Sequence, residues 1–362
     1  MRALVDFYRN KKVLVTGHTG FKGSWLTIWL KQLSAEVIGL SLDPKTDIDL
    51  FLLAGLSDKI KDYRQDIREL EKVERILGKE QPEIVFHLAA QALVLPGYKN
   101  PVSTFETNIM GTVNILEACR QTPSVKQIVI VTTDKVYENK ESLTGYKETD
   151  PLGGHDPYSA SKAATEIVTQ SYRLSFTQSP NHPITQSIST ARAGNVIGGG
   201  DWSDYRLVPD CIRSLEAGKE ILIRNPESVR PWQHVLEPLA GYLLLAIKMS
   251  EDPLVFSGPL NFGPAEEDFA RVSEVAGLLI SLWGSGRWVK ATDTGKPHET
   301  GLLRLNSNKA RELLGWRPVL DFREAIRWTT DWYKAYKETD VYSLCAQQIE
   351  RFTERWNTGS LK

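Results

Sequence analysis

Tyr158 and Lys162 stand four residues apart in the segment Tyr158-Ser-Ala-Ser-Lys162. On a helix, this spacing puts both side chains on one face. A tyrosine hydroxyl titrates near pH ~10, which is too high for a base at neutral pH. An ammonium and a cationic cofactor ring nearby favour the phenolate, and lowering the pKa by about 3 units takes ~4 kcal/mol. The pair predicts that a hydroxyl proton is removed while a hydride leaves the same carbon.

A second group of reactive side chains, Thr133-Asp134-Lys135, follows the apolar run at residues 127–132. Thr133 is expected to hydrogen-bond the substrate hydroxyl opposite Tyr158. This threonine makes the set more specific than the Tyr-x-x-x-Lys pair alone, which also fits a helix with an exposed tyrosine and lysine. Asp134 and Lys135 add an acid and an amine, and they indicate that loss of water follows the hydride transfer.

A glycine-rich loop, Gly17-His-Thr-Gly20-Phe21-Lys-Gly23, follows a β-branched run at residues 13–16 and opens a helix. The glycines permit a tight turn and let backbone N–H groups approach a pyrophosphate at the positive end of the helix. The G-x-x-G-x-x-G spacing is typical of extended short-chain dehydrogenase/reductases. We therefore predict a dinucleotide site here rather than an ordinary turn.

Further residues are expected along the same cofactor. Asp43 follows the second strand and can accept hydrogen bonds from a ribose hydroxyl, although it also fits a turn before Pro44. No arginine lies in residues 41–44 to favour a 2′-phosphate, so NAD is preferred over NADP. Asp66 and Ile67 are expected at the adenine, and Leu88-Ala89-Ala90 is expected to pack against the dinucleotide. Both segments also fit a purely structural role.

The elements that position these residues alternate along the first half of the chain. Short apolar strands between amphipathic helices predict the α/β class, with a Rossmann-type doubly wound parallel sheet. Strands are expected at residues 13–16, 37–42, 84–88, 127–132 and 188–193, and helices at 24–33, 69–77, 104–120 and 159–176. The later elements are shorter. We predict an NAD-binding domain over residues 1–185 and a smaller mixed α/β substrate-binding domain over 186–362, interleaved with the first.

Composition narrows the classes of function. The 44 Lys and Arg residues balance 45 Asp and Glu residues without a basic stripe, which argues against nucleic-acid binding. No apolar run approaches the roughly 20 residues of a membrane helix, and the N-terminus does not read as a signal peptide. Cys119, Cys211 and Cys345 have no metal spacing and form no even disulfide set, so we expect reduced thiols, no metal site and a cytoplasmic protein.

Longer motifs carry a family resemblance. Thr133-Asp134-Lys135, with Arg192-Ala-Gly-Asn195-Val-Ile-Gly-Gly-Gly-Asp-Trp and Arg230-Pro-Trp-Gln-His-Val, resembles the nucleoside-diphosphate-hexose 4,6-dehydratases, and among them those that act on CDP-glucose. The resemblance runs from about residue 8 to residue 335. It implies oxidation at C4 of the sugar, loss of water across C5 and C6, and return of the hydride to C6. The 4-keto-6-deoxy product would serve deoxysugar synthesis for a surface polysaccharide, the O-antigen of lipopolysaccharide.

The resemblance makes Asp134 the acid for the departing 6-hydroxyl and puts Lys135 in the position of the C5 base, where the family typically carries glutamate. The ordinary pKa values of lysine and aspartate favour the ion pair over Asp-H with neutral Lys by about 6.5 units, or ~9 kcal/mol. Burial, or separation of the two heads, must remove most of that difference. Adjacent residues at a strand end point apart, which helps. Lys135 is therefore either the base or a cation that stabilises the enolate.

The nucleotide end of the substrate calls for arginine, whose planar fork suits phosphate. Arg206 and Arg230 are predicted to bind the pyrophosphate, Asn195 to add a contact and Gln91 to contact the sugar, although either arginine also fits a solvated surface. By resemblance, helices 104–120 and 159–176 would pair in a homodimer, with a tetramer left open. The rivals are another nucleotide-sugar 4,6-dehydratase, a 4-epimerase, and a non-catalytic NAD-binding sensor.

Overall fold

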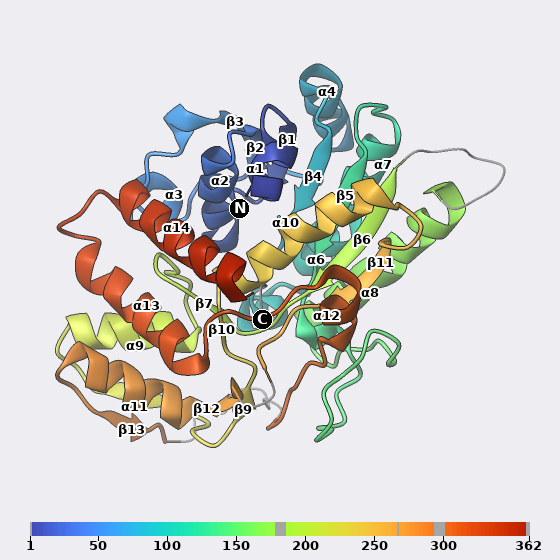
Figure 1. The fold of residues 1–362 in the computed structure, drawn as a ribbon. Helices are drawn as coiled ribbons and strands as arrows, with labels where there is room; N and C mark the ends of the chain where they lie inside the picture. Colours follow the sequence, from blue (N-terminus) through green and yellow to red (C-terminus); the bar gives the residue numbers. More distant parts are fainter. Residues whose placement is uncertain (1, 178–185, 266–267, 293–300, 360–362) are drawn as a thin grey trace.

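A seven-stranded, all-parallel sheet forms the centre of the computed structural model, which describes residues 2–177, 186–265, 268–292 and 301–359 (Figure 1). Its order is β3-β2-β1-β4-β5-β6-β11. The strands are β1 (Lys12–Thr16), β2 (Glu36–Ser41), β3 (Lys61–Arg64), β4 (Ile84–His87), β5 (Gln127–Val131), β6 (Ser187–Arg192) and β11 (Gly258–Asn261). The order reverses between β1 and β4, where a doubly wound sheet opens a crevice at the carboxyl ends of its strands. The predicted fold class is confirmed.

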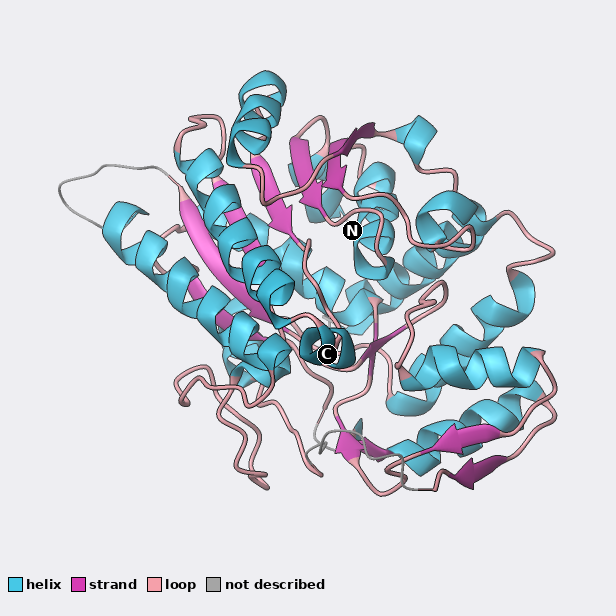
Figure 2. Ribbon diagram, turned by 180° about the vertical axis from the view of Figure 1, so that it is seen from behind, coloured by secondary structure: helices cyan, strands magenta, loops and turns pink. Residues whose placement is uncertain are grey.

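Helices cover both faces of the sheet, as opposite views show (Figures 1 and 2). Successive side chains of β1 alternate between two apolar clusters: Val13 and Val15 join one cluster, and Leu14 joins the other. The first cluster includes residues of α1 (Arg2–Tyr8), α2 (Phe21–Gln32), α10 (Leu236–Glu251) and α14 (Val341–Gly359). The second includes residues of α4 (Leu70–Glu80) and α7 (Gly111–Arg120), with α8 (Pro157–Tyr172) packed beside α7.

The long helix expected at residues 104–120 is interrupted. It consists of α6 (Pro101–Phe105), a π-helical turn η2 (Glu106–Met110) and α7. Asn108 lies in the π turn, and its side chain accepts a hydrogen bond from Gln91 N at 2.8 Å and donates to Ser161 Oγ at 2.8 Å. The π turn thus places an amide between the β4–α5 loop and α8, in keeping with the frequent use of such turns near functional sites. Helix α8 likewise continues into a π turn, η4 (Arg173–Thr177).

The second half of the chain supplies short elements and two strands of the main sheet. Helices α9 (Leu207–Glu216) and α11 (Val272–Trp283) lie with β8 (Ile221–Ile223) and β13 (Trp288–Lys290) at one end of the molecule, at the lower left of Figure 1. Because β6 and β11 complete the central sheet, the two halves share one sheet. Residue 185 lies outside the described residues, and the division at 185/186 stays a prediction.

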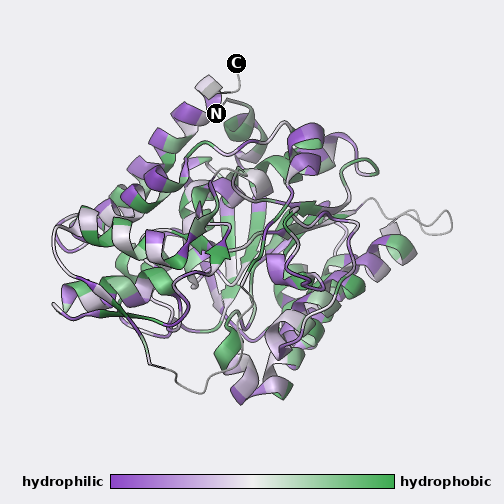
Figure 3. Cartoon of the chain, turned by 90° about the horizontal axis from the view of Figure 1, so that it is seen from below, coloured by the Kyte–Doolittle hydropathy of each residue, from purple (hydrophilic) through white to green (hydrophobic). Residues whose placement is uncertain are grey.

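The remaining elements are short or peripheral. Along the outer helices, hydrophilic and hydrophobic residues alternate (Figure 3). Within the described ranges, no helix is both long and apolar enough to cross a membrane. These elements are α3 (Leu50–Leu53), η1 (Ser57–Lys59), α5 (Val94–Lys99), η3 (Asp134–Val136), β7 (Val196–Ile197), α9 (Leu207–Glu216), β8 (Ile221–Ile223), β9 (Val229–Arg230), β10 (Gln233–His234), β12 (Ala270–Arg271), α11 (Val272–Trp283), β13 (Trp288–Lys290), α12 (Asn308–Leu314) and α13 (Phe322–Ala335).

Candidate active site

A cleft of about 1310 Å³ opens beside the carboxyl ends of the central strands. Every residue predicted to bind or react lies on its wall, although their roles stay predictions. These residues are Gly17, Gly20, Phe21, Gly23, Asp43, Asp66, Ile67, Leu88, Ala89, Ala90, Gln91, Thr133, Asp134, Lys135, Tyr158, Lys162, Asn195, Arg206 and Arg230. The fold therefore collects residues from both halves of the chain around one space.

The glycine loop forms a cradle that side chains would fill. Gly17 has a φ of 73°, and a Cβ there would lie 2.7 Å from Ala89 N. A Cβ at Gly23 would overlap the carbonyl oxygen of Gly17. Helix α2 starts after Gly20, which has no side chain to cap its first N–H groups. The bare helix end and the close backbone approach fit the pyrophosphate of a dinucleotide.

An arginine missed in the sequence lies beside the predicted ribose carboxylate. Arg64 Nε is 3.8 Å from Asp43 Oδ1, and the Asp43 side chain is 84% exposed. Arg64 also pairs with Asp62 at 2.7 Å and donates to the carbonyl oxygen of Leu42 at 3.3 Å. Residues 41–44 indeed contain no arginine, but Arg64 reaches the same turn from another strand. Arg64 comes from β3, a strand that the sequence did not predict.

The adenine-side residues have structural partners as well. Arg68 hydrogen-bonds the Asp66 carboxylate through its backbone and side chain, which lowers the pKa of Asp66. Ile67 packs against Gly111, where a Cβ would lie 2.5 Å from Ile67 Cδ1. The Gln91 side chain donates to Leu93 O and Thr104 Oγ1 and accepts from Leu93 N at 2.7 Å. The polar atoms of Gln91 therefore hold its own loop, which weakens its prediction as a sugar contact.

Asp134 lies in the 3₁₀ turn η3, immediately beyond the strand end where it was expected. Its carboxyl group is buried, and Thr133 Oγ1 donates to Oδ1 at 2.9 Å. Asp134 Oδ2 is also buried and has no hydrogen-bond partner among the described residues. A buried polar oxygen without a partner is costly unless it meets a ligand group. This carboxyl is therefore placed to hydrogen-bond a group in the cleft.

Lys135 follows in the same turn. Its side chain is partly exposed, whereas that of Asp134 is buried. Successive residues of a 3₁₀ turn point about 120° apart, because the turn has three residues. No ion pair joins Asp134 to Lys135 in the part of the chain that the structure describes. The two heads are thus kept apart, as the sequence argument requires, although the cause is a 3₁₀ turn rather than strand alternation.

Tyr158 and Lys162 lie in the first turns of α8. Asp156 caps the start of the helix by accepting a hydrogen bond from Ser159 N at 3.0 Å, and Pro157 occupies the first helical position. Burial raises the pKa of Tyr158 to about 12, although a hydrogen bond with Thr133 opposes the shift. Thr133 thus links the Tyr158 hydroxyl to the Asp134 carboxyl.

The Lys162 ammonium points under the end of β5. Its Nζ donates to the carbonyl oxygen of Val131 at 3.1 Å. Burial lowers the pKa of Lys162 to about 8, and the negative charge of Glu166 opposes that shift. Burial therefore favours the protonated phenol of Tyr158, and a positive charge beside it would lower its pKa.

Lys22 is a further charged residue of the cleft that the sequence argument passed over. Burial, together with the positive charges of Arg206 and Lys162, lowers its pKa to about 7, and the carboxylates of Asp134 and Asp201 oppose the shift. This places a third lysine within electrostatic reach of the predicted acid. The signal was present in the sequence as a lysine inside the glycine motif.

The predicted phosphate-binding arginines differ in their surroundings. Arg206 pairs with the buried Asp201 at 3.0 Å. Arg230 donates to the carbonyl oxygens of Val229 at 2.9 Å and Gly301 at 3.1 Å. Asn195 adopts a left-handed conformation with a φ of 45° on the wall of the cleft. Both guanidinium groups are therefore oriented by the protein.

The family model for GDP-mannose 4,6 dehydratase matches residues 14–329. The chain belongs to this dehydratase family. A CDP-glucose 4,6-dehydratase of Salmonella typhimurium strain LT2 is 42% identical over 346 residues, which are 95% of this chain and 96% of that protein.

Solved structures agree with the fold of the dehydratase family. The UDP-glucose 4-epimerase of Thermus thermophilus, in complex with NAD, is 27% identical with a TM-score of 0.75, covering 89% of this chain and 99% of that one. A dTDP-glucose 4,6-dehydratase from Streptomyces venezuelae is 24% identical with a TM-score of 0.75, covering 89% of this chain and 97% of that one. At this identity the similarity supports only the fold.

Proposed function

We propose that this member of the family is an NAD-dependent CDP-glucose 4,6-dehydratase, a hydro-lyase that forms CDP-4-keto-6-deoxy-D-glucose. The observation that carries the proposal is the buried Asp134 carboxyl, which shares Thr133 with Tyr158 and has one oxygen without a partner among the described residues. A 4-epimerase needs Tyr158 and the cofactor but no acid at this position. The cytidine specificity is supported by the relative from Salmonella typhimurium.

The cofactor site fits NAD through the glycine cradle and the bare end of α2. When bound, NAD accepts the hydride from C4 of the sugar and returns a hydride to C6. Gly17, Gly20 and Gly23 would hold the pyrophosphate, Asp43 the ribose, and Asp66 and Ile67 the adenine. The segment after β4, Leu88–Ala90, would pack against the dinucleotide. A nicotinamide ring held there would add a positive charge that lowers the pKa of Tyr158.

The side chains of the cleft then divide the proton transfers. Tyr158 takes the proton of the 4-hydroxyl as C4 is oxidised, with Thr133 holding the same oxygen. The resulting ketone acidifies the C5 proton. As that proton leaves, the C6–O bond breaks, and Asp134 donates its proton to the departing hydroxyl, which leaves as water. Reduction of C6 and return of a proton to C5 leave no net oxidation, and the proton that Tyr158 gained balances the one that Asp134 gave up.

The amine at the C5 step is Lys135. It acts as the base for the C5 proton or as a cation that stabilises the enolate oxygen, and substitution separates the two roles. Arg206 and Arg230 bind the substrate pyrophosphate, and Asn195 adds a contact. Gln91 lines the sugar end through its loop rather than through a free amide.

We propose that two copies pair through α6, η2, α7 and α8 in a four-helix arrangement. Exposed apolar side chains along these elements support the proposal. They are Val102 (65% exposed), Phe105 (37%), Met110 (51%) and Ile167 (58%), and Leu174 (51%) follows on η4. Light scattering would distinguish the expected dimer from a tetramer. We also propose a cytoplasmic location, which suits the three free, buried cysteines.

Turnover of nucleotide sugars tests the proposed function. Purified protein with NAD is offered CDP-glucose, with UDP-, GDP- and dTDP-glucose in parallel, and the 4-keto-6-deoxy product is followed by its absorbance in strong base. We expect product from CDP-glucose without net NADH. Product from another nucleotide would discard the cytidine claim, and a C4 epimer would discard the dehydratase. NAD binding without any product would support the sensor.

A further inference from the structure

A buried ion pair holds both ends of the segment that carries the acid. Glu166, on α8, pairs with Arg192, on β6, at 2.8 Å, and each side chain is 3% exposed. Thr132 Oγ1 donates to Glu166 Oε1 at 2.5 Å, just before the catalytic turn. Arg192 donates to Tyr137 Oη at 2.8 Å, just after it. The residues between these two contacts are Thr133, Asp134, Lys135 and Val136.

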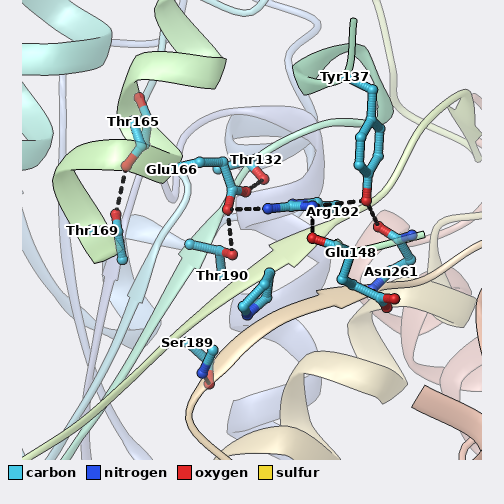
Figure 4. A network of polar contacts seen from close by, with 12 residues as sticks. Thr132, Tyr137, Glu148, Thr165, Glu166, Thr169, Ser189, Thr190, Arg192 and Asn261 are labelled. Atoms are coloured by element: carbon cyan, nitrogen blue, oxygen red, sulfur yellow. Dashed lines mark hydrogen bonds and ion pairs between the residues drawn. The ribbon is translucent and has the colours of Figure 1, made fainter. Parts of the chain in front are cut away.

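Hydrogen bonds connect the Glu166–Arg192 pair to further residues on both sides (Figure 4). Glu166 also accepts a hydrogen bond from Thr190 Oγ1 at 2.7 Å. Tyr137 donates to Asn261 Oδ1 at 2.7 Å, at the end of β11. The network therefore ties the catalytic turn to α8 and to two neighbouring strands, so the turn cannot shift without breaking buried hydrogen bonds.

Stability alone is a weak reason for such a pair. Replacing a buried ion pair with apolar side chains of similar volume is often neutral or stabilising, because desolvating two charges offsets their attraction. Arg192 Nε also has no hydrogen-bond partner among the described residues. The cost of the pair is better explained by the segment that it holds. Glu166 lies one helical turn beyond Lys162, so the same carboxylate faces the lysine of the hydride-transfer pair.

We propose that Glu166 and Arg192 are positioning residues, which fix the segment from Thr132 to Tyr137 so that the Asp134 carboxyl and the Lys135 amine meet C6 and C5 of the bound sugar. This inference rests on the proposed dehydratase function. It assigns the pair mainly to the elimination step, because Asp134 and Lys135 lie inside the segment, whereas Tyr158, on which oxidation at C4 depends, lies on α8 and meets the segment through Thr133.

The test removes one hydrogen bond at a time and leaves the ion pair in place, because breaking the pair would risk the fold. Thr132→Val releases the front of the segment, and Tyr137→Phe releases its end. Thr190→Val is the matched control, because it removes a bond to the same carboxylate from a strand outside the segment. Enzyme with bound NAD is mixed with limiting CDP-glucose, and NADH absorbance is followed through one turnover.

We expect NADH to appear in all three variants, slowed by no more than a few-fold in the two segment variants, where the contact of Thr133 with Tyr158 is disturbed. Its disappearance should slow by about 10-fold to 100-fold in Thr132→Val and Tyr137→Phe, since a misplacement of about 1 Å can cost 100-fold. Thr190→Val should keep both rates. The proposal is overturned if both phases keep their wild-type rates in the two segment variants, or if Thr190→Val slows the second phase equally. If the wild-type protein forms no NADH with any nucleotide sugar, the proposed function itself has failed.

Discussion

The carboxyl group of Asp134 lies directly against the backbone of Gly194, and a Cβ at residue 194 would overlap Asp134 Oδ2. Gly194 lies between β6 and β7, far from Asp134 in sequence. The glycine therefore keeps the space in which the acid sits, and the two residues form one feature of the cleft.

Gly194→Ala should displace this carboxyl. Gly194 is not among the residues with a positive φ, so alanine fits its backbone and the clash falls on Asp134. We expect product formation to fall by about 100-fold while NAD affinity is unchanged. Steady-state rates and calorimetric NAD binding would check this. Gly78→Ala on α4 is the control, because no atom lies within 4 Å of its added Cβ. Equal activity in both variants would contradict the assignment.

Asp134→Asn keeps the shape of the acid and removes its proton. Oxidation at C4 should proceed, and elimination should slow by about 100-fold to 10,000-fold, the usual contribution of a general acid. NADH would then accumulate in a single turnover, whereas Tyr158→Phe should show no NADH at all. Rapid appearance and decay of NADH in the asparagine variant would rule Asp134 out as the acid.

Substitutions at Lys135 separate a base from a cation. If Lys135 removes the C5 proton, Lys135→Glu should sustain turnover and Lys135→Met should lose about 100-fold or more. If its charge stabilises the enolate, both variants lose activity and glutamate loses more. The readout is exchange of the C5 proton with deuterated solvent. Full activity in the methionine variant excludes both roles.

The stability of the protein should depend on pH through Glu237, a residue outside the site. Burial raises the pKa of Glu237 to about 8, although the N–H groups of Leu320 and Val319 hydrogen-bond its carboxylate and oppose the shift. Because the pKa is raised on folding, the contribution of Glu237 to the free energy of unfolding is fully present below the pKa of the unfolded chain, near ~4.3. That contribution is lost as pH rises through about 8.

Denaturant unfolding of wild type and Glu237→Gln across this range checks the sign. The glutamine variant should lose less stability than wild type between pH ~5 and pH ~9, because it has no proton to release. A steeper loss in the variant would show that the carboxylate is favoured by its two N–H partners.

Local motifs explain how much of the fold and site could be predicted from sequence. The strand before the glycine loop and the helix that carries Tyr158 have strong local patterns, so the doubly wound class followed. Strand β3 was missed because Lys61–Arg64 is short and mostly polar, and Arg64 was missed with it. Strand β11 was also missed, because it contains glycine and proline, which are unusual inside a strand. The structure tolerates these residues because β11 lies at the edge of the sheet.

Contacts between distant segments were beyond the sequence argument. The pairing of Glu166 with Arg192 joins α8 to β6, and no local spacing indicates it. The break in the helix at residues 104–120 depends on Asn108, whose partners lie on a loop and on another helix. The approach of Gly194 to Asp134 is of the same kind. These long-range features set the geometry of the site, whereas the motifs set its chemistry.

The transfer of label from C4 to C6 tests the central claim most directly. CDP-glucose carrying deuterium at C4 is converted by the protein with unlabelled NAD in ordinary water, and the product is examined by NMR. We predict deuterium in the C6 methyl group. Deuterium that stays at C4, with inversion there, would show an epimerase, and loss of the deuterium to free NADH would show a simple dehydrogenase; either result would contradict the dehydratase.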